Sequence, residues 1–135
     1  MFYETELTIP AGRTEANPIE GILKVTHGII HHVEVEFRSG TDFTAWVKLN
    51  LREVTLFPTN PDGWFKADGR AIVFNDYRPV FSAPYEIKIV GCAPSSTYDH
   101  TVYVRIGILP QEALDPMTGL RGLFNKFFKL VGLTK

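Results

Sequence analysis

The sequence predicts an all-β fold, an antiparallel β-sandwich or barrel, followed by an amphipathic C-terminal α-helix. Seven or eight short segments alternate between apolar and polar residues and are separated by turn formers, with no helical periodicity before residue 110. The chain has 135 residues, of which 44% are hydrophobic, enough for one domain with a real core. Prolines fall at the ends of the alternating segments, as a sheet requires: Pro10, Pro18, Pro58, Pro61, Pro79, Pro84 and Pro110. We therefore expect a β-sandwich over residues 1–110, a connector over 111–118 and a helix over 119–135.

The first half of the chain contains the clearest alternations. Residues 2–9 place Tyr3, Thr5, Leu7 and Ile9 on one face of a strand and glutamates on the other. A second strand is expected over residues 19–26, followed by a tight turn at His27-Gly28, because glycine tolerates positive φ. The third strand, residues 29–37, alternates Ile29, His31, Val33, Val35 and Phe37 with Ile30, His32, Glu34 and Glu36.

The second half is more interrupted. A strand is expected over residues 43–51, with Ala45, Val47 and Leu49 inward, and residues 54–57 continue it past a bend. Turn formers dominate residues 58–69. A short strand at 71–74, an edge strand at 79–81 and a strand at 84–90 follow. Residues 100–109 close the set, and the apolar positions predicted inward are Val102, Val104, Ile106 and Ile108.

The C-terminal segment from Gly119 to Leu133 has the 3.6-residue period of an amphipathic helix. Its polar face carries Arg121, Lys126 and Lys129. This face pattern allows packing on the chain's own domain, docking on another protein, or insertion into a membrane interface. The candidate partner-binding residues are Leu120, Leu123, Phe124, Phe127, Phe128, Leu130 and Val131.

The residue pattern predicts no catalytic site, metal or cofactor. His31 and His32 would point to opposite faces of a strand, so adjacent positions cannot share one ion. Cys92 and His100 form a conceivable nucleophile–base pair, yet no third group orients it. The formal net charge of −1 gives no global electrostatic case for nucleic acid. The start, MFYETELTIP, lacks the features of a signal peptide.

Aromatic residues outside the expected core form a possible surface site. Trp46 is predicted on an outer face, and the others lie in or near loops: Trp64, Phe65 and Tyr77. Such side chains can stack on sugars or anchor a protein interface. Trp64 and Phe65 can also simply fold over an open end of the sandwich.

Three stretches resemble small jelly-roll β-sandwich proteins of phage and prophage virions: GIIHHVEVEF, LFPTNPDGWFKADGRAIVF and YDHTVYVRIGILP. The resemblance covers residues 19–110 and carries over no functional residue. It implies a non-enzymatic structural protein of the virion, such as a minor capsid, decoration or spike-base component. Such a protein would bind copies of itself or a shell protein, through the C-terminal helix. The rival expectations are a glycan- or polymer-binding module and a peripheral membrane protein anchored by the helix; a non-viral protein would be soluble.

Overall fold

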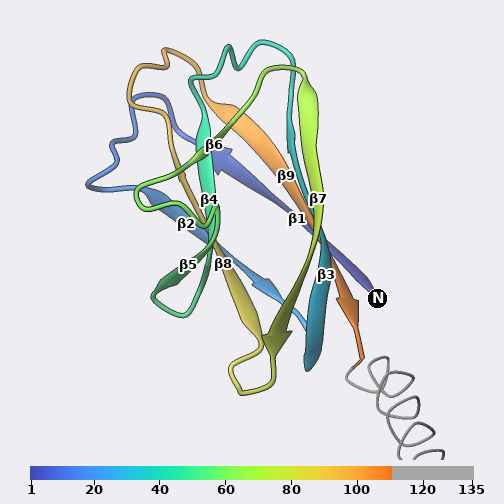
Figure 1. Cartoon of the computed structure of the whole chain (residues 1–135). Coiled ribbons are helices and arrows are strands. Elements are labelled where there is room, and N and C mark those ends of the chain that lie inside the picture. Colours follow the sequence, from blue (N-terminus) through green and yellow to red (C-terminus); the bar gives the residue numbers. More distant parts are fainter. Residues whose placement is uncertain (111–135) are drawn as a thin grey trace, which may run out of the picture.

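The computed structural model describes residues 1–110, which form two antiparallel β-sheets packed face to face (Figure 1). The predicted all-β, antiparallel architecture is confirmed, and residues 1–110 contain no helix. The predicted connector and C-terminal helix lie outside the described residues. The strands are β1 (Phe2–Ile9), β2 (Ile19–Lys24), β3 (Gly28–Phe37), β4 (Trp46–Leu51), β5 (Val54–Phe57), β6 (Phe65–Lys66), β7 (Arg70–Val80), β8 (Glu86–Cys92) and β9 (His100–Leu109).

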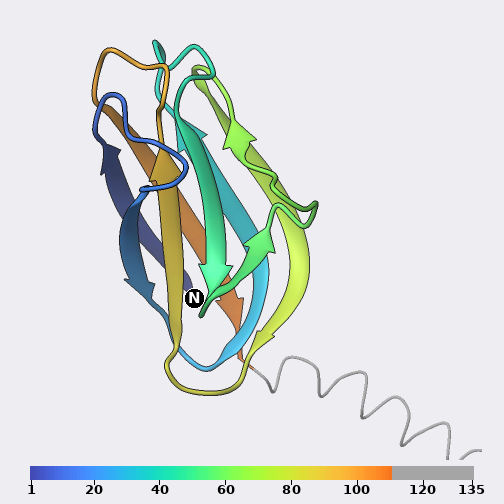
Figure 2. The same cartoon turned by 90° about the vertical axis from the view of Figure 1, so that its left-hand side faces the viewer.

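The strands pair as if the chain formed one long antiparallel hairpin that is then folded over on itself. Sheet A has the order β1-β9-β3-β7, and sheet B has the order β2-β8-β4-β5, with β6 paired to β4. The pairs β1–β9, β2–β8, β3–β7 and β4–β5 are nested along the chain, so its first half runs antiparallel to its second half. Folding this hairpin over adds the pairs β3–β9 and β4–β8. The chain therefore crosses repeatedly from one sheet to the other (Figure 2).

The space between the sheets is filled by the residues that the alternation places inward. Side chains with no exposed surface come from both sheets, including Val33 and Val35 of β3 and Leu49 of β4. The inward positions predicted for residues 100–109 are all confirmed at 0% exposure. Burial of apolar surface, worth about 25 cal/mol per Å², is thus concentrated in one continuous core.

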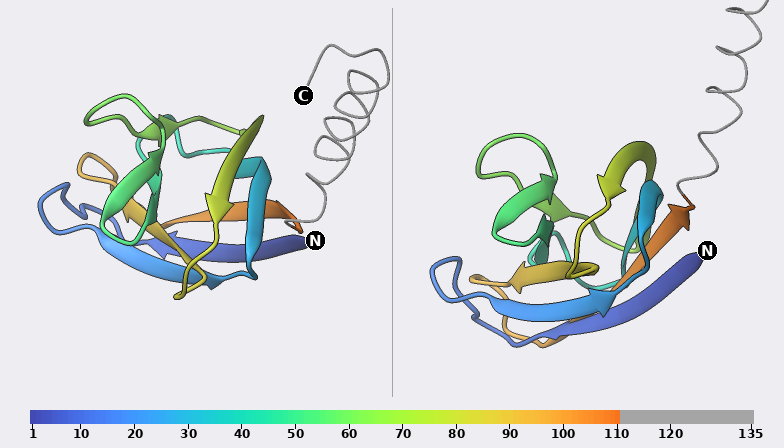
Figure 3. Two further views of the ribbon diagram at one scale, coloured as in Figure 1. Left: turned by 60° about the horizontal axis from the view of Figure 1, so that its bottom comes forward. Right: turned by 90° about the horizontal axis from the view of Figure 1, so that it is seen from below.

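The two ends of the described chain lie together. The Met1 amino group donates to the Ile108 carbonyl at 2.7 Å, and Figure 3 shows the N-terminus beside the end of β9. At the opposite end of the sandwich, the loop of residues 10–18 binds the loop of residues 93–99 through the Gly12 N–H and the Ala93 carbonyl, 3.0 Å apart. Both ends are therefore closed by backbone contacts between distant segments.

The predicted tight turn at His27-Gly28 is wrong. Gly28 is the first residue of β3 and is not among the glycines with positive φ. It lies so close to β9 that an added Cβ would be 2.4 Å from the Leu109 carbonyl oxygen. Glycine is needed here for close backbone approach, while residues 25–27 carry the chain from sheet B to sheet A.

Several strand boundaries also differ from the predictions, among them the end of β2 at Lys24 rather than residue 26 and the range of β8, which is Glu86–Cys92 rather than 84–90. The two pieces expected at 71–74 and 79–81 are one strand, β7, which tolerates Pro79 because it is the edge of sheet A. The short β6 lies inside the segment predicted to be turns and depends on distant pairing with β4. Strand β4 begins at Trp46 rather than Phe43, since Asp42 and Phe43 both have positive φ.

A bulge at His31 reverses one prediction about the third strand. Ile30 pairs with Ile108 of β9 and His32 pairs with Gly107, so β3 has one extra residue between these pairs. Ile30 and Val33 are both fully buried, which would be impossible with strict alternation. The prediction that His31 shares a face with Val33 is therefore wrong, and so is the prediction that His31 and His32 point to opposite faces.

Candidate functional site

The outer face of sheet A carries an acidic surface, defined here as Glu4, Glu6, Glu34 and Glu36. Alternation places these residues outward on β1 and β3, on either side of Arg105 in β9. The Arg105 guanidinium contacts three of them: Nε lies 2.7 Å from Glu4, Nη1 lies 3.4 Å from Glu34 and Nη2 lies 3.5 Å from Glu36. Hydrogen bonding to Glu4 is the largest cause of a raised Arg105 pKa. One cation thus organises three carboxylates.

His32 extends this network toward β7. Its Nε2 lies 3.0 Å from Glu34, and its Nδ1 lies 2.9 Å from the Asn75 side-chain oxygen. The hydrogen bond to Glu34 raises the pKa of His32, and the same bond lowers the pKa of Glu34. Both ring nitrogens of His32 are therefore engaged in holding the sheet face together.

The bulge places the His31 ring on the same outer side as His32. The two ring centroids are 6.3 Å apart, and both rings contact Phe2 edge-on. Gly107 makes room, since an added Cβ would lie 2.8 Å from both His31 and Phe2. Within residues 1–110 no three His, Cys, Asp or Glu side chains are grouped to hold a metal ion. The two histidines form an aromatic cluster with Phe2.

The outer face of sheet B carries a Trp–Lys cluster, defined here as Trp46, Lys48, Trp64 and Lys66. Trp46 pairs with Lys66 across β4 and β6, and the same register places Lys48 opposite Trp64. The Lys66 ammonium lies 3.7 Å from the Trp46 ring centroid, and the Lys48 ammonium lies 4.5 Å from that of Trp64. The indole centroids are 6.4 Å apart. Trp and Lys therefore alternate both along each of the two paired segments and from one segment to the other.

The cluster lies over a small apolar layer outside the main core. Val90 and Cys92 face outward on β8, as cross-strand neighbours of Lys48 and Trp46. Both are nonetheless buried, at 3% and 0% exposure. Trp46 is further fixed by donating its indole N–H to the Phe43 carbonyl at 3.0 Å. The Trp–Lys cluster is thus a preorganised surface rather than a set of loose side chains.

Only half of the predicted aromatic site comes together. Trp46 and Trp64 are adjacent on sheet B, as described. Phe65 turns inward and packs on Phe74, with 5.7 Å between centroids, so it closes the open edge of the sandwich. Tyr77 is 70% exposed but belongs to β7 in sheet A. Sequence reasoning could not join Trp46 to Trp64, because their proximity depends on the pairing of β4 with β6.

Cys92 and His100 do not form a nucleophile–base pair. Burial is the main cause that raises the pKa of the Cys92 thiol, to about 11, which keeps it protonated and inert. His100 instead contacts the Ser96 hydroxyl, with 2.7 Å between Nε2 and Oγ, a pair that sequence reasoning missed. Ser96 donates to the Tyr98 carbonyl at 2.8 Å, so His100 donates to Ser96. This polarity is the reverse of a catalytic pair and closes the loop before β9.

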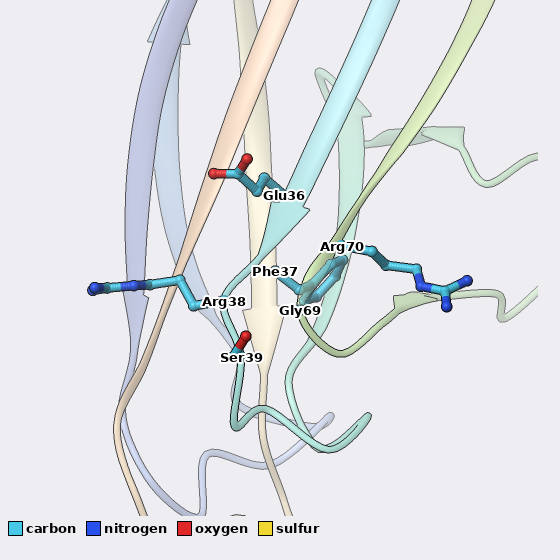
Figure 4. Close-up of a pocket in the computed structure, with 6 residues that line it drawn as sticks. All are labelled: Glu36, Phe37, Arg38, Ser39, Gly69 and Arg70. Atoms are coloured by element: carbon cyan, nitrogen blue, oxygen red, sulfur yellow. The ribbon is translucent and has the colours of Figure 1, made fainter.

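A recess of about 420 Å³ lies where β3 ends and β7 begins. Its lining includes Arg38, Ser39 and Arg70, a composition that would suit an anion. Figure 4 shows, however, that the two arginine side chains extend in opposite directions, away from each other. Gly69, at φ 62°, brings the backbone close to Ser39 between them. The recess therefore has no converging positive charge.

Comparisons with known proteins and the C-terminal segment do not identify a further functional site in the described residues. No protein-family model matches the chain, and no curated protein sequence does either. Within residues 1–110 there is no helix that could span a membrane. The predicted partner-binding residues of the C-terminal segment lie outside the described residues. The two sheet faces are thus the surfaces on which a functional argument rests.

Proposed function

We propose that this protein is a non-enzymatic structural component of a larger assembly, of the kind found in virus-like particles. The strand order carries the proposal. Without β6, the structure has the strand order of an eight-stranded jelly roll, with β1-β9-β3-β7 in one sheet and β2-β8-β4-β5 in the other. This is the architecture of many viral capsid domains. Lectin domains share this architecture, so fold alone is only an analogy.

The placement of reactive groups supports a non-enzymatic role. The Cys92 thiol is buried with a raised pKa. His32 is held between Asn75 and Glu34, and His100 is a donor to Ser96. The two histidines have structural partners that would have to be released before either ring could act on a substrate, and the Cys92 thiol would have to be uncovered.

Attachment in this proposal is by the segment Gly119–Leu133. Its seven large apolar residues at helical spacing match a helix that lays one face in a hydrophobic groove of a neighbouring copy or of a shell protein. Complete burial of such a face would contribute on the order of 10 kcal/mol before the costs of docking. That is sufficient for a stable tether.

A second candidate function is binding of a glycan or polymer, and it rests on the Trp46–Trp64 pair. Two indoles 6.4 Å apart on a sheet face can stack on neighbouring sugar rings. Each indole, however, carries an ammonium group over one face, which a sugar would have to displace or share. The Trp46–Trp64 geometry therefore favours glycan binding less than it favours a protein–protein interface.

Light scattering on the full chain and on a chain ending at Asp115 tests the proposal. We expect an oligomeric full chain and a folded, monomeric shortened chain. Two folded monomers would refute attachment between copies through the C-terminal segment, and flotation with liposomes would then identify a lipid anchor. Unfolding of the shortened chain would contradict the proposal differently, by making the segment part of the domain's own core.

A further inference from the structure

The two outer faces of the sandwich carry opposite charge. On sheet A, the four carboxylates of the acidic surface meet a single guanidinium, that of Arg105, which leaves an excess of three negative charges while His32 is neutral. On sheet B, the Trp–Lys cluster carries two positive charges. Within residues 1–110, neither Lys48 nor Lys66 forms an ion pair, in contrast to Lys88, which contacts Glu20 and Glu53. The chain's net charge of −1 conceals this separation.

The acidic surface retains acceptors beyond those that Arg105 satisfies. Three carboxylates share one guanidinium, which has five donors for about twelve lone-pair positions. Glu6 is exposed and two residues from Glu4 on β1, and its carboxylate has no hydrogen-bond partner within residues 1–110. The surface can therefore accept further cationic donors without breaking its own network.

Both faces also expose apolar groups that a purely electrostatic role would not need. Phe2 and Tyr77 on sheet A are each 70% exposed, and Val73 is 52% exposed. On sheet B the two indoles lie half-buried beside their ammonium groups. Exposed aromatic side chains are among the residue types that anchor protein interfaces.

We propose that the Trp–Lys cluster of one copy docks on the acidic surface of a second copy. The contact rests on the proposed function, since it names how the bodies of neighbouring subunits meet. It is heterologous: sheet B of one subunit faces sheet A of the next, so repetition gives a ring or an open stack. Docking of either surface on its own copy would instead bring like charges together, carboxylates against carboxylates or ammonium groups against ammonium groups, which is unfavourable.

The size of the faces makes this contact modest in strength. Four strands about 4.8 Å apart and some eight residues long cover roughly 500 Å², less than the roughly 800 Å² per partner of a standard interface. The contact is therefore weak alone and effective when the C-terminal segment already holds subunits together, because tethering raises the effective concentration. Salt weakens it, since its charges are close to solvent.

The test reverses the charge of each surface in the full chain. The cluster variant is Lys48→Glu with Lys66→Glu, and the acidic-surface variant is Glu6→Lys with Glu36→Lys. A control variant, Arg70→Glu, reverses one exposed charge at the start of β7, beside the recess at the end of the sandwich and outside both surfaces. Sedimentation velocity measures self-association, and circular dichroism checks folding.

Each surface variant should self-associate about tenfold more weakly than the wild type and the control. A mixture of the two surface variants should recover the wild-type association, because each supplies the charge that the other has lost. If the cluster variant fails to fold, the acidic-surface variant and the control still decide between docking and no docking.

Unchanged association of both surface variants would overturn the docking and leave the proposed function intact. So would weakening that the mixture does not reverse. A full chain that sediments as one copy under every condition would instead overturn the proposed function together with the docking.

Discussion

The two outer faces of the sandwich hold their strands together by different interactions. Sheet A holds its strands together with a hydrogen-bonded charge network centred on Arg105 of β9. Sheet B holds β6 to β4 with indoles and ammonium groups over a thin apolar layer. The network depends on charge and is open to screening, whereas the Trp–Lys cluster depends mainly on buried aromatic area. Perturbations that distinguish charge from area should therefore separate the two faces.

The largest effect is expected from Trp46→Ala. The change removes an indole that packs on Trp64, covers the layer beneath it and donates to the Phe43 carbonyl. Because the indole is only half-buried, we expect a loss of about 2–3 kcal/mol of unfolding free energy, below the usual cost of a buried Trp. Urea denaturation at low and at high salt measures it. A loss that shrinks markedly in high salt would show that charge, not area, holds this face.

Arg105→Met should cost about 1–2 kcal/mol at neutral pH, since it leaves Glu4, Glu34 and Glu36 adjacent without their shared cation. Screening should reduce that cost, so the comparison with Trp46→Ala is made at two salt concentrations. Arg105→Lys is the matched control and should recover part of the stability, because lysine keeps the charge without the fork geometry. An equal cost at both salt concentrations would contradict the charge network.

These contrasts also show what the sequence can predict. Alternation predicts β1 and β9 and their inward residues, because along each strand the inward residues are more buried than most of their outward neighbours. The bulge at His31 is invisible in the sequence: IIHHV contains an apolar residue at both parities, and only pairing with Gly107 selects the register.

The Trp–Lys cluster on sheet B could not be predicted from the sequence either. The two residues of β6 are too few for a periodic signal, and they become a strand only by pairing with β4. The separation of Trp64 from Phe65, one outward and one inward, follows from that same pairing. Long-range register, rather than local propensity, decides the surface sites of this fold.

A smaller effect is expected from Lys66→Gln, which removes the ammonium 3.7 Å from the Trp46 ring. The interaction is exposed on one side, so we expect a cost of about 0.5–1 kcal/mol. Lys66→Arg keeps a cation over the ring and should be nearly neutral. Thermal denaturation of the two variants measures the difference. Equal melting temperatures would mean that the ammonium adds nothing to the face.

The smallest effect concerns pH. The raised pKa of His32, above its ordinary 6.5, gives stability that is fully present below pH 6.5 and lost as pH rises through the folded-state pKa. The lowered pKa of Glu34, below 4.5, gives stability that is present above that pH and lost as pH falls through its folded-state pKa. The His32–Glu34 pair therefore contributes most to the stability of the folded protein between pH 4.5 and pH 6.5.

Melting curves of the wild type and His32→Gln, from pH 5 to pH 9, should converge at the alkaline end. The difference between them should stay below about 1 kcal/mol, because the pair is close to solvent. Glutamine keeps a hydrogen-bonding side chain at this position without the titrating charge. A constant difference across the whole range would show that the His32 charge does not contribute.

The molar mass of the full chain in solution tests the central claim most directly. Sedimentation equilibrium at neutral pH should give a mass above the 15.2 kDa of one chain. The average mass should fall toward smaller species as salt rises, since the body contacts are electrostatic while the C-terminal attachment is apolar. A mass of one chain at every concentration and every salt level would contradict the account of this protein as a subunit of an assembly.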